Sequence, residues 1–257
     1  MRSHCPLAAL LPALLLALCI APARSAPVPA VAQPVPDTLA QRLLACASCH
    51  ARVDERGNPV NDSFFPRIGG KPAGYLFNQL INFRDGRRQY PLMTYLVEHL
   101  PEPYLREIAA HFAAQPPTML QPPAVLPPAT TVADAVADAV ADAARGRQLA
   151  LHGDAARNIP ACVACHGARL TGVQPTIPGL LGLPRDYVNA QFGAWRNGAR
   201  RAHAPDCMAQ ITARMSLEDV AAVAGWLAAQ PMPADARALA APGRALPLAC
   251  GSVAEAR

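Results

Sequence analysis

The sequence carries one five-residue motif twice, and this duplication restricts the possible fold more than any other feature. Residues 46–50 read Cys-Ala-Ser-Cys-His, and residues 162–166 read Cys-Val-Ala-Cys-His. Downstream, segment 72–86 matches segment 184–198, and each copy then ends in an apolar stretch that closes on Ala-Ala-Gln-Pro. Three matched blocks in the same order are not expected by chance. We therefore predict two tandem domains of one fold.

The spacing inside the motif indicates its chemistry. Two cysteines separated by two residues lie about one helical turn apart on one face, where their sulfurs reach the two vinyl groups of a porphyrin. The adjacent histidine then points at the iron. A single motif would also suit a redox dithiol or half a zinc site. Two copies that both end in histidine favour two covalently bound haem c groups. The thioethers would form at Cys46, Cys49, Cys162 and Cys165, and the iron ligands would be His50 and His166.

Methionine positions predict the second axial ligand of each iron. Met93 and Met208 follow the motif histidine at nearly the same distance in the two copies. Each also lies equally far before the residue that precedes the last helix, which is Leu100 in one copy and Met215 in the other. A single methionine is normally a core residue, but the matched spacing selects Met93 and Met208 as iron ligands. A thioether ligand opposite histidine raises the reduction potential.

The N-terminus is typical of an export signal. Arg2 precedes an apolar run from Leu7 to Ile20, and small residues at 21–23 offer a cleavage site. The alternative is a transmembrane anchor, but the run is short for a bilayer span and contains Pro12. We expect residues 1–23 to be a signal peptide and the mature chain to be periplasmic, either soluble or loosely membrane-associated.

The rest of the chain is predicted to be all-α. Prolines 72 and 184 can open helices that end at Gly86 and Gly198, and Ser216 can cap the last helix of the second copy. Between the copies, a proline-rich stretch precedes a Val-Ala-Asp-Ala repeat that suits either an acidic helix or a flexible spacer. We assign the first domain to 37–115, a linker to 116–144, the second domain to 145–232 and a C-terminal tail to 233–257.

These features together resemble class I cytochromes c, and the doubled unit is similar to cytochrome c4 over residues 37–232. The strongest local match is Gly-Lys-Pro-Ala-Gly-Tyr at 70–75 with the helix that follows it. The resemblance implies two tandem class I cytochrome c domains, each wrapping one haem. It places four further residues around the haems: Pro66 and Pro178, whose carbonyls would accept the ring N–H of the histidine ligands, and Tyr75 and Tyr187.

The resemblance also implies an electron carrier rather than an enzyme. Our leading hypothesis is a periplasmic protein that transfers single electrons from a quinol-oxidising complex to a terminal oxidase. A haem-bearing subunit of a periplasmic dehydrogenase is the alternative, because the proline-rich linker and the unmatched tail would suit docking. A dihaem peroxidase would need an open iron position, which methionine fills in both copies. The formal net charge of +5 is too modest to indicate nucleic acid. We expect redox proteins, and no small-molecule substrate, as partners.

Two cysteines of the exported chain lie outside the haem motifs, Cys207 and Cys250. An exported protein meets an oxidising compartment, so the simplest prediction is a disulfide between them. Because Cys207 adjoins Met208, such a bond would help to hold this methionine on the iron. The alternatives are a free Cys207 that competes for the iron, or a Cys250 that bridges to a partner chain.

Overall fold

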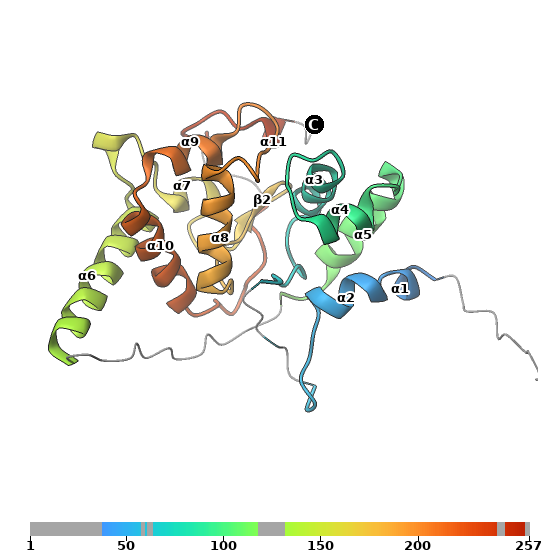
Figure 1. Cartoon of the computed structure of the whole chain (residues 1–257), viewed down its shortest axis with the longest axis horizontal. Coiled ribbons are helices and arrows are strands. Elements are labelled where there is room, and N and C mark those ends of the chain that lie inside the picture. Colours follow the sequence, from blue (N-terminus) through green and yellow to red (C-terminus); the bar gives the residue numbers. More distant parts are fainter. Residues whose placement is uncertain (1–37, 58–59, 61–63, 118–131, 241–244, 255–257) are drawn as a thin grey trace, which may run out of the picture. The chain divides into compact units, whose positions relative to one another are not determined.

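Helices dominate the described chain, as predicted for an all-α protein (Figure 1). The predicted signal peptide lies outside the described residues. No described helix combines the length and the hydropathy that crossing a membrane requires. The computed structural model describes residues 38–57, 60, 64–117, 132–240 and 245–254.

The first copy of the motif lies in a group of helices with its own apolar core. These helices are α1 Leu39–Arg42, α2 Leu44–His50, α3 Ala73–Arg84, α4 Pro91–Val97 and α5 Glu102–Ala114. Helix α3 packs against α4 and α5. Leu105, Ile108 and Phe112 of α5 are almost inaccessible to solvent, so one face of this helix is buried in the core.

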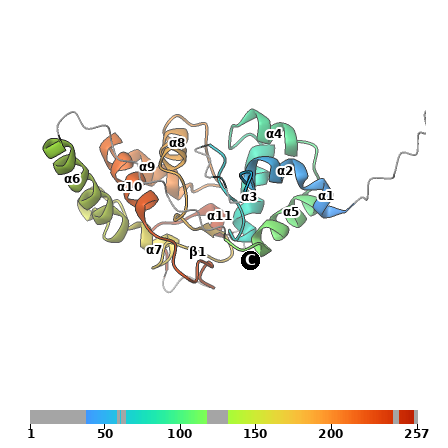
Figure 2. The same cartoon turned by 90° about the horizontal axis from the view of Figure 1, so that it is seen from below.

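The second copy lies in a matching group, with a separate core. Its elements are α6 Val132–Leu151, the 3₁₀ helix η1 Ala155–Arg157, α7 Cys162–His166, β1 Gly172–Val173, β2 Ile177–Pro178, α8 Arg185–Arg196, α9 Cys207–Arg214, α10 Leu217–Ala229 and α11 Gly251–Ala254. Helix α10 packs along α6 and against α8 (Figure 2). Gly146 of α6 allows this close approach, because a Cβ atom there would overlap the Ala222 carbonyl of α10.

The Val-Ala-Asp-Ala repeat, for which the sequence allowed a helix or a flexible spacer, lies in helix α6. It is helical from Val132 and continues without a break to Leu151. Its last turns carry the buried residues Leu149 and Ala150 into the second core. The structure therefore has a helix where the sequence allowed a helix or a spacer, and residues 118–131 of the linker lie outside the described residues.

The predicted helix boundaries are confirmed where prolines and glycines set them. Helices α3 and α8 begin directly after Pro72 and Pro184. Two residues after each helix, Gly86 and Gly198 have positive φ angles of 72° and 77°, a conformation that ends helices and favours glycine. The sequence showed no strand pattern, and the structure adds the β1–β2 pair of two-residue antiparallel strands.

The two domains meet through equivalent segments that follow α3 and α8. Arg88 and Arg200 form an isolated antiparallel bridge. The flanking backbone bonds run from the Gln89 N–H to the Ala199 carbonyl and from the Arg201 N–H to the Arg87 carbonyl, each at 2.7 Å. Residues after 37 accordingly form one compact unit.

A buried carboxylate organises the second domain. Ser216 and Asp219 form the capping box at the start of α10, which confirms the predicted Ser216 cap. The Asp219 side chain is fully buried and pairs with Arg145 and with Arg157 Nη1 at 2.6 Å. Burial acts to raise the pKa of Asp219, but hydrogen bonds from Arg157, the Ser216 backbone and Arg145 outweigh it and hold the pKa at about 2.

We expect Asp219→Asn to lower the free energy of unfolding at neutral pH by about 2 kcal/mol, because two arginines lose their buried counter-charge. The pKa of Asp219 is lower in the folded chain than in the unfolded chain. This contribution is therefore fully present above pH about 4 and is lost as the pH falls toward about 2. Guanidinium unfolding followed by circular dichroism at several pH values measures it.

Asp235→Asn is the matched control, because Asp235 also contacts two arginines but its side chain is 46% exposed. This substitution should leave the unfolding free energy nearly unchanged. Equal losses in the two variants, or a loss in Asp219→Asn that persists unchanged at pH 2, would contradict the assigned role.

Candidate haem-binding sites

The first Cys-x-x-Cys-His motif lies on helix α2. Cys46 and Cys49 are partly buried and are not joined in a disulfide. His50 ends the helix, and its Nδ1 lies 2.7 Å from the Pro66 carbonyl oxygen. Because that carbonyl accepts the Nδ1 proton, the other ring nitrogen, Nε2, keeps its lone pair for binding a metal ion.

The second motif lies on the short helix α7 and repeats this arrangement. His166 is buried, and its Nδ1 lies 2.8 Å from the Pro178 carbonyl oxygen. Cys162 and Cys165 are again unpaired. The hydrogen bonds that the resemblance implied for Pro66 and Pro178 are therefore found in both domains.

The protonation states suit haem attachment better than the other readings of the motif. Burial lowers the pKa of His50 and of His166, which favours the neutral imidazole that binds metals. Burial raises the pKa of Cys46, and raises that of Cys162 to about 12. A redox dithiol needs the opposite shift. Among the described residues, no three His, Cys, Asp or Glu side chains converge on a metal position, as a zinc site would require.

Each motif opens into its own cavity. The first cavity has a volume of about 610 Å³ and the second about 180 Å³. Every sequence-predicted site residue lines one of them. The first cavity is lined by Cys46, Cys49, His50, Pro66 and Met93, the second by Cys162, Cys165, His166, Pro178 and Met208, and both by Tyr75 and Tyr187.

The two predicted methionines reach these cavities from helices of their own. Met93 lies on α4, and Met208 is the second residue of α9. Met215 also lines the second cavity, but it is 5% exposed and belongs to the apolar core. The structure therefore brings a histidine and the predicted methionine to each cavity, and it leaves Met215 as a second candidate that variants can separate.

The two cavities share a polar wall where the domains meet. Arg88 Nη1 donates to Gln79 Oε1 at 2.9 Å, and its Nη2 donates to Gln191 Oε1 at 2.7 Å and to the Tyr187 hydroxyl at 3.1 Å. Arg200 mirrors this pattern: its Nη1 donates to Gln191 at 2.8 Å, and its Nη2 donates to Gln79 at 3.2 Å and to the Tyr75 hydroxyl at 3.5 Å. Each arginine thus contacts glutamines of both domains and the tyrosine of the other domain.

This wall carries positive charge without a carboxylate beside it. Arg200 is buried, and Arg88 and Lys71, the single lysine of the sequence, are partly buried. Within the described part of the chain, none of the three makes an ion pair with Asp or Glu. Burial lowers the pKa of Lys71 and of Arg200, and the neighbouring cation lowers each further.

These unmatched cations test whether the cavities fit haem. Burying like charges without a counter-charge costs several kcal/mol. Each haem carries two carboxylates, which would supply counter-charges for Arg88, Arg200 and Lys71. Together with the apolar cavity walls and the cysteine and histidine positions, the residues present fit two haems.

Sequence reasoning missed this arginine pair. Arg84 and Arg196, which lie one turn earlier on the matched helices, line neither cavity. In the structure, Arg84 forms salt bridges with Asp85 and Glu102, and Arg196 donates a hydrogen bond to the Met215 carbonyl. A signal for the correct pair was available, because Arg88 and Arg200 both lie two residues after the glycine that ends the matched helix.

Comparison with known proteins agrees with this geometry. A thiosulfate dehydrogenase electron acceptor from Thiomonas intermedia is 34% identical over 188 residues, which cover 73% of this chain and 79% of the relative. Cytochrome c4 from Pseudomonas aeruginosa is 28% identical over 188 residues, 72% of this chain and 84% of the relative. The chain belongs to the dihaem cytochromes c. No protein-family model matches it.

Solved structures show the same fold for this dihaem cytochrome. Reduced cytochrome c4 from Pseudomonas stutzeri matches 73% of the chain with a TM-score of 0.57 at 24% identity, and the match covers 94% of that structure. The thiosulfate dehydrogenase TsdBA from Marichromatium purpuratum matches 74% of the chain with a TM-score of 0.57 at 30% identity. The cytochrome spans only 37% of that longer chain. Two tandem class I cytochrome c domains are thus confirmed, and the protein carries two covalently bound haem c groups and transfers electrons.

We expect Arg88→Gln and Arg200→Gln each to lower both haem midpoint potentials. Each substitution removes a positive charge that would stabilise the electron added on reduction. Coulomb's law at an effective dielectric of about 20 gives a loss on the order of 1–2 kcal/mol per charge, or about tenfold in the reduction equilibrium. A spectroelectrochemical titration of the holoprotein measures both potentials.

Arg84→Gln and Arg196→Gln are matched controls, because they remove the same charge one helical turn earlier in each repeat. These variants should shift the potentials much less. Equal shifts in all four variants would show that the wall has no special role.

Proposed function

We propose that this cytochrome is a periplasmic carrier of single electrons whose donor is a thiosulfate-oxidising dehydrogenase. The observation that carries the proposal is the shared wall of Tyr75, Tyr187 and Arg200, which lines both cavities. Two haems bound on either side of one wall would exchange electrons within the molecule. The redox partner is inferred from the thiosulfate dehydrogenase electron acceptor of Thiomonas intermedia, 34% identical to this chain.

The chain's own residues would divide the work in each domain as follows. In the first, Cys46 and Cys49 would hold the porphyrin by thioethers, and His50 would bind the iron in the orientation that the Pro66 carbonyl sets. Met93 would be the second protein ligand of this iron. Haem supplies an iron that alternates between the ferric and ferrous states.

The second domain repeats this set with its own residues. Cys162 and Cys165 form the thioethers, His166 and Met208 are the axial ligands, and Pro178 orients the histidine. With methionine as the second protein ligand of each iron, peroxide would find no open position, which supports a carrier rather than a peroxidase.

Location in the periplasm is supported by two features. Residues 1–23 have the pattern of an export signal. The disulfide between Cys207 and Cys250 is of the kind that persists in oxidising compartments.

Methionine variants test the axial assignment. The ferric protein should show a low-spin spectrum with a weak charge-transfer band from methionine to iron at long wavelength. Met93→Ala and Met208→Ala should each remove about half of this band and lower one midpoint potential, because a thioether ligand favours ferrous iron.

Met215→Leu is the control, because Met215 lines the same cavity as Met208 but packs in the core. It should keep the full band. Loss of half the band in Met215→Leu, with Met208→Ala unaffected, would transfer the ligand role to Met215. A high-spin wild-type protein that turns over peroxide rapidly would replace the carrier with a peroxidase.

Stopped-flow mixing tests the donor. The ferric holoprotein is mixed with a purified thiosulfate dehydrogenase and thiosulfate, and separately with a quinol-oxidising complex and quinol. We expect both haems to be reduced on the stopped-flow timescale when thiosulfate and the dehydrogenase are both present. Without the dehydrogenase, thiosulfate should not reduce them on that timescale.

The second candidate donor is the quinol-oxidising complex, which the similarity to cytochrome c4 favours. Rapid reduction by quinol with none by thiosulfate would overturn the dehydrogenase as donor and leave the protein a shuttle toward a terminal oxidase.

A further inference from the structure

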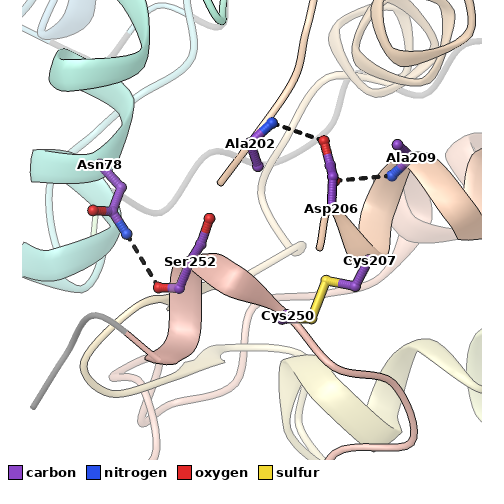
Figure 3. The surroundings of a disulfide bond; sticks show 7 residues. All are labelled: Asn78, Ala202, Asp206, Cys207, Ala209, Cys250 and Ser252. Carbon is purple, nitrogen blue, oxygen red and sulfur yellow. Dashed lines mark hydrogen bonds between the residues drawn. A yellow bond between two sulfur atoms is a disulfide. The ribbon is translucent and has the colours of Figure 1, made fainter. Parts of the chain in front are cut away.

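The C-terminal segment reaches the second haem site through a disulfide. Cys207, the first residue of α9, is bonded to Cys250, with 5.1 Å between their Cα atoms (Figure 3). The predicted pairing is confirmed. Since Cys207 directly precedes Met208, the bond joins the tail to the helical turn that carries the proposed iron ligand.

Backbone packing fixes the tail against the loop before α9. The Gly251 N–H donates to the Pro205 carbonyl at 3.0 Å. A Cβ atom at Gly251 would overlap the Ala204 carbonyl, so the segment lies directly on this loop. Asp206 fixes the same loop from within, because its carboxylate accepts from the Ala202 N–H at 2.7 Å and from the Ala209 N–H at 3.0 Å (Figure 3).

Three further hydrogen bonds tie the tail to other parts of the molecule. Asn78 of α3, in the first domain, donates from Nδ2 to the Ser252 carbonyl at 3.2 Å (Figure 3). Leu239 pairs with β1: its N–H donates to the Gly172 carbonyl at 2.9 Å, and its carbonyl accepts from the Gln174 N–H at 2.7 Å. The tail therefore contacts the first domain, the loop after the second haem motif and the methionine helix.

The tail borders one of the two haem cavities and not the other. Leu246, Cys250, Ser252 and Val253 line the second cavity, whereas no described tail residue lines the first. The second cavity measures about 180 Å³ and the first about 610 Å³. The first cavity is bordered instead by Tyr90 and Leu92, which are 41% and 47% exposed.

We propose that segment 245–254 and the Cys207–Cys250 disulfide form a clasp that holds Met208 on the second iron and covers that site. The proposal rests on the axial ligands named under the proposed function. The bond between iron and a thioether is weak enough to break when its helix moves away. A crosslink at the adjacent residue removes many conformations in which Met208 lies off the iron. The first iron has no such clasp among the described residues and is the haem that exchanges its methionine for external ligands.

Ligand exchange on the ferric holoprotein tests this inequality. Imidazole should bind wild-type protein in two phases, a fast phase at the first haem and a slow phase at the second. In the Cys207→Ala/Cys250→Ala variant, the slow phase should accelerate by at least about tenfold, which corresponds to about 1.4 kcal/mol. The fast phase should stay unchanged and serves as an internal control.

Met93→Ala and Met208→Ala assign the two phases, because each variant frees one iron for immediate binding. A slow phase that belongs to the first haem, or one that the double cysteine variant leaves unchanged, would overturn the clasp. If Met208→Ala leaves the charge-transfer band intact, the axial assignment itself fails. That outcome is distinct from a clasp that has no effect on a correctly assigned Met208.

Wild-type protein offers a second route if the double variant does not fold. A water-soluble phosphine reduces the disulfide of the folded holoprotein: the disulfide takes up two electrons and two protons and yields two thiols, and the phosphine is oxidised to its oxide with oxygen from water. The thiols are then alkylated, and ferricyanide returns both irons to the ferric state. The clasp predicts the same acceleration of the slow phase in the reduced and alkylated sample. In a sample treated with the alkylating agent alone, the slow phase should keep its original rate. An unchanged slow phase after complete alkylation would refute the clasp.

Discussion

Two guanidinium groups meet where the domains join, and the arrangement of both haem sites depends on how their charge is balanced. Arg88 and Arg200 bond to glutamines of both domains and to a tyrosine across the boundary, but none of these partners is anionic. Hydrogen bonds to neutral groups orient a cation without neutralising it. Haem carboxylates bound beside this pair would supply the counter-charge that the described residues do not.

This dependence couples cofactor attachment to domain arrangement. The apolar cores of the two domains are separate and can form independently. The contact between the domains, in contrast, includes a short backbone bridge and a cluster of like charges, beside hydrogen bonds such as that from Asn78 to the Ser252 carbonyl. A haem held by thioethers would keep its carboxylates near this cluster when its iron changes oxidation state.

Features of the structure that depend on local sequence patterns could be predicted from the sequence. The motif repeat, the spacing of Met93 and Met208 and the proline and glycine boundaries gave the all-α fold, the residues of both cavities and the ends of α3 and α8. The repeat places Arg88 and Arg200 at equivalent positions, but it does not show how one copy faces the other. Arg88 therefore went unrecognised. Helix α6 was undecided, since alanine and valine repeats suit a helix only when a partner such as α10 covers them.

Lys71 gives the molecule an unusual surface chemistry. Positive charge elsewhere in the sequence comes from arginine, so this single ε-amine lies on the wall of the two haem cavities and no other side chain carries one. Reagents that acylate amines would therefore find a single lysine side chain, and that side chain is partly buried. The rate at which Lys71 is acylated would accordingly report on access to the wall of the haem cavities, in a background with no competing lysines.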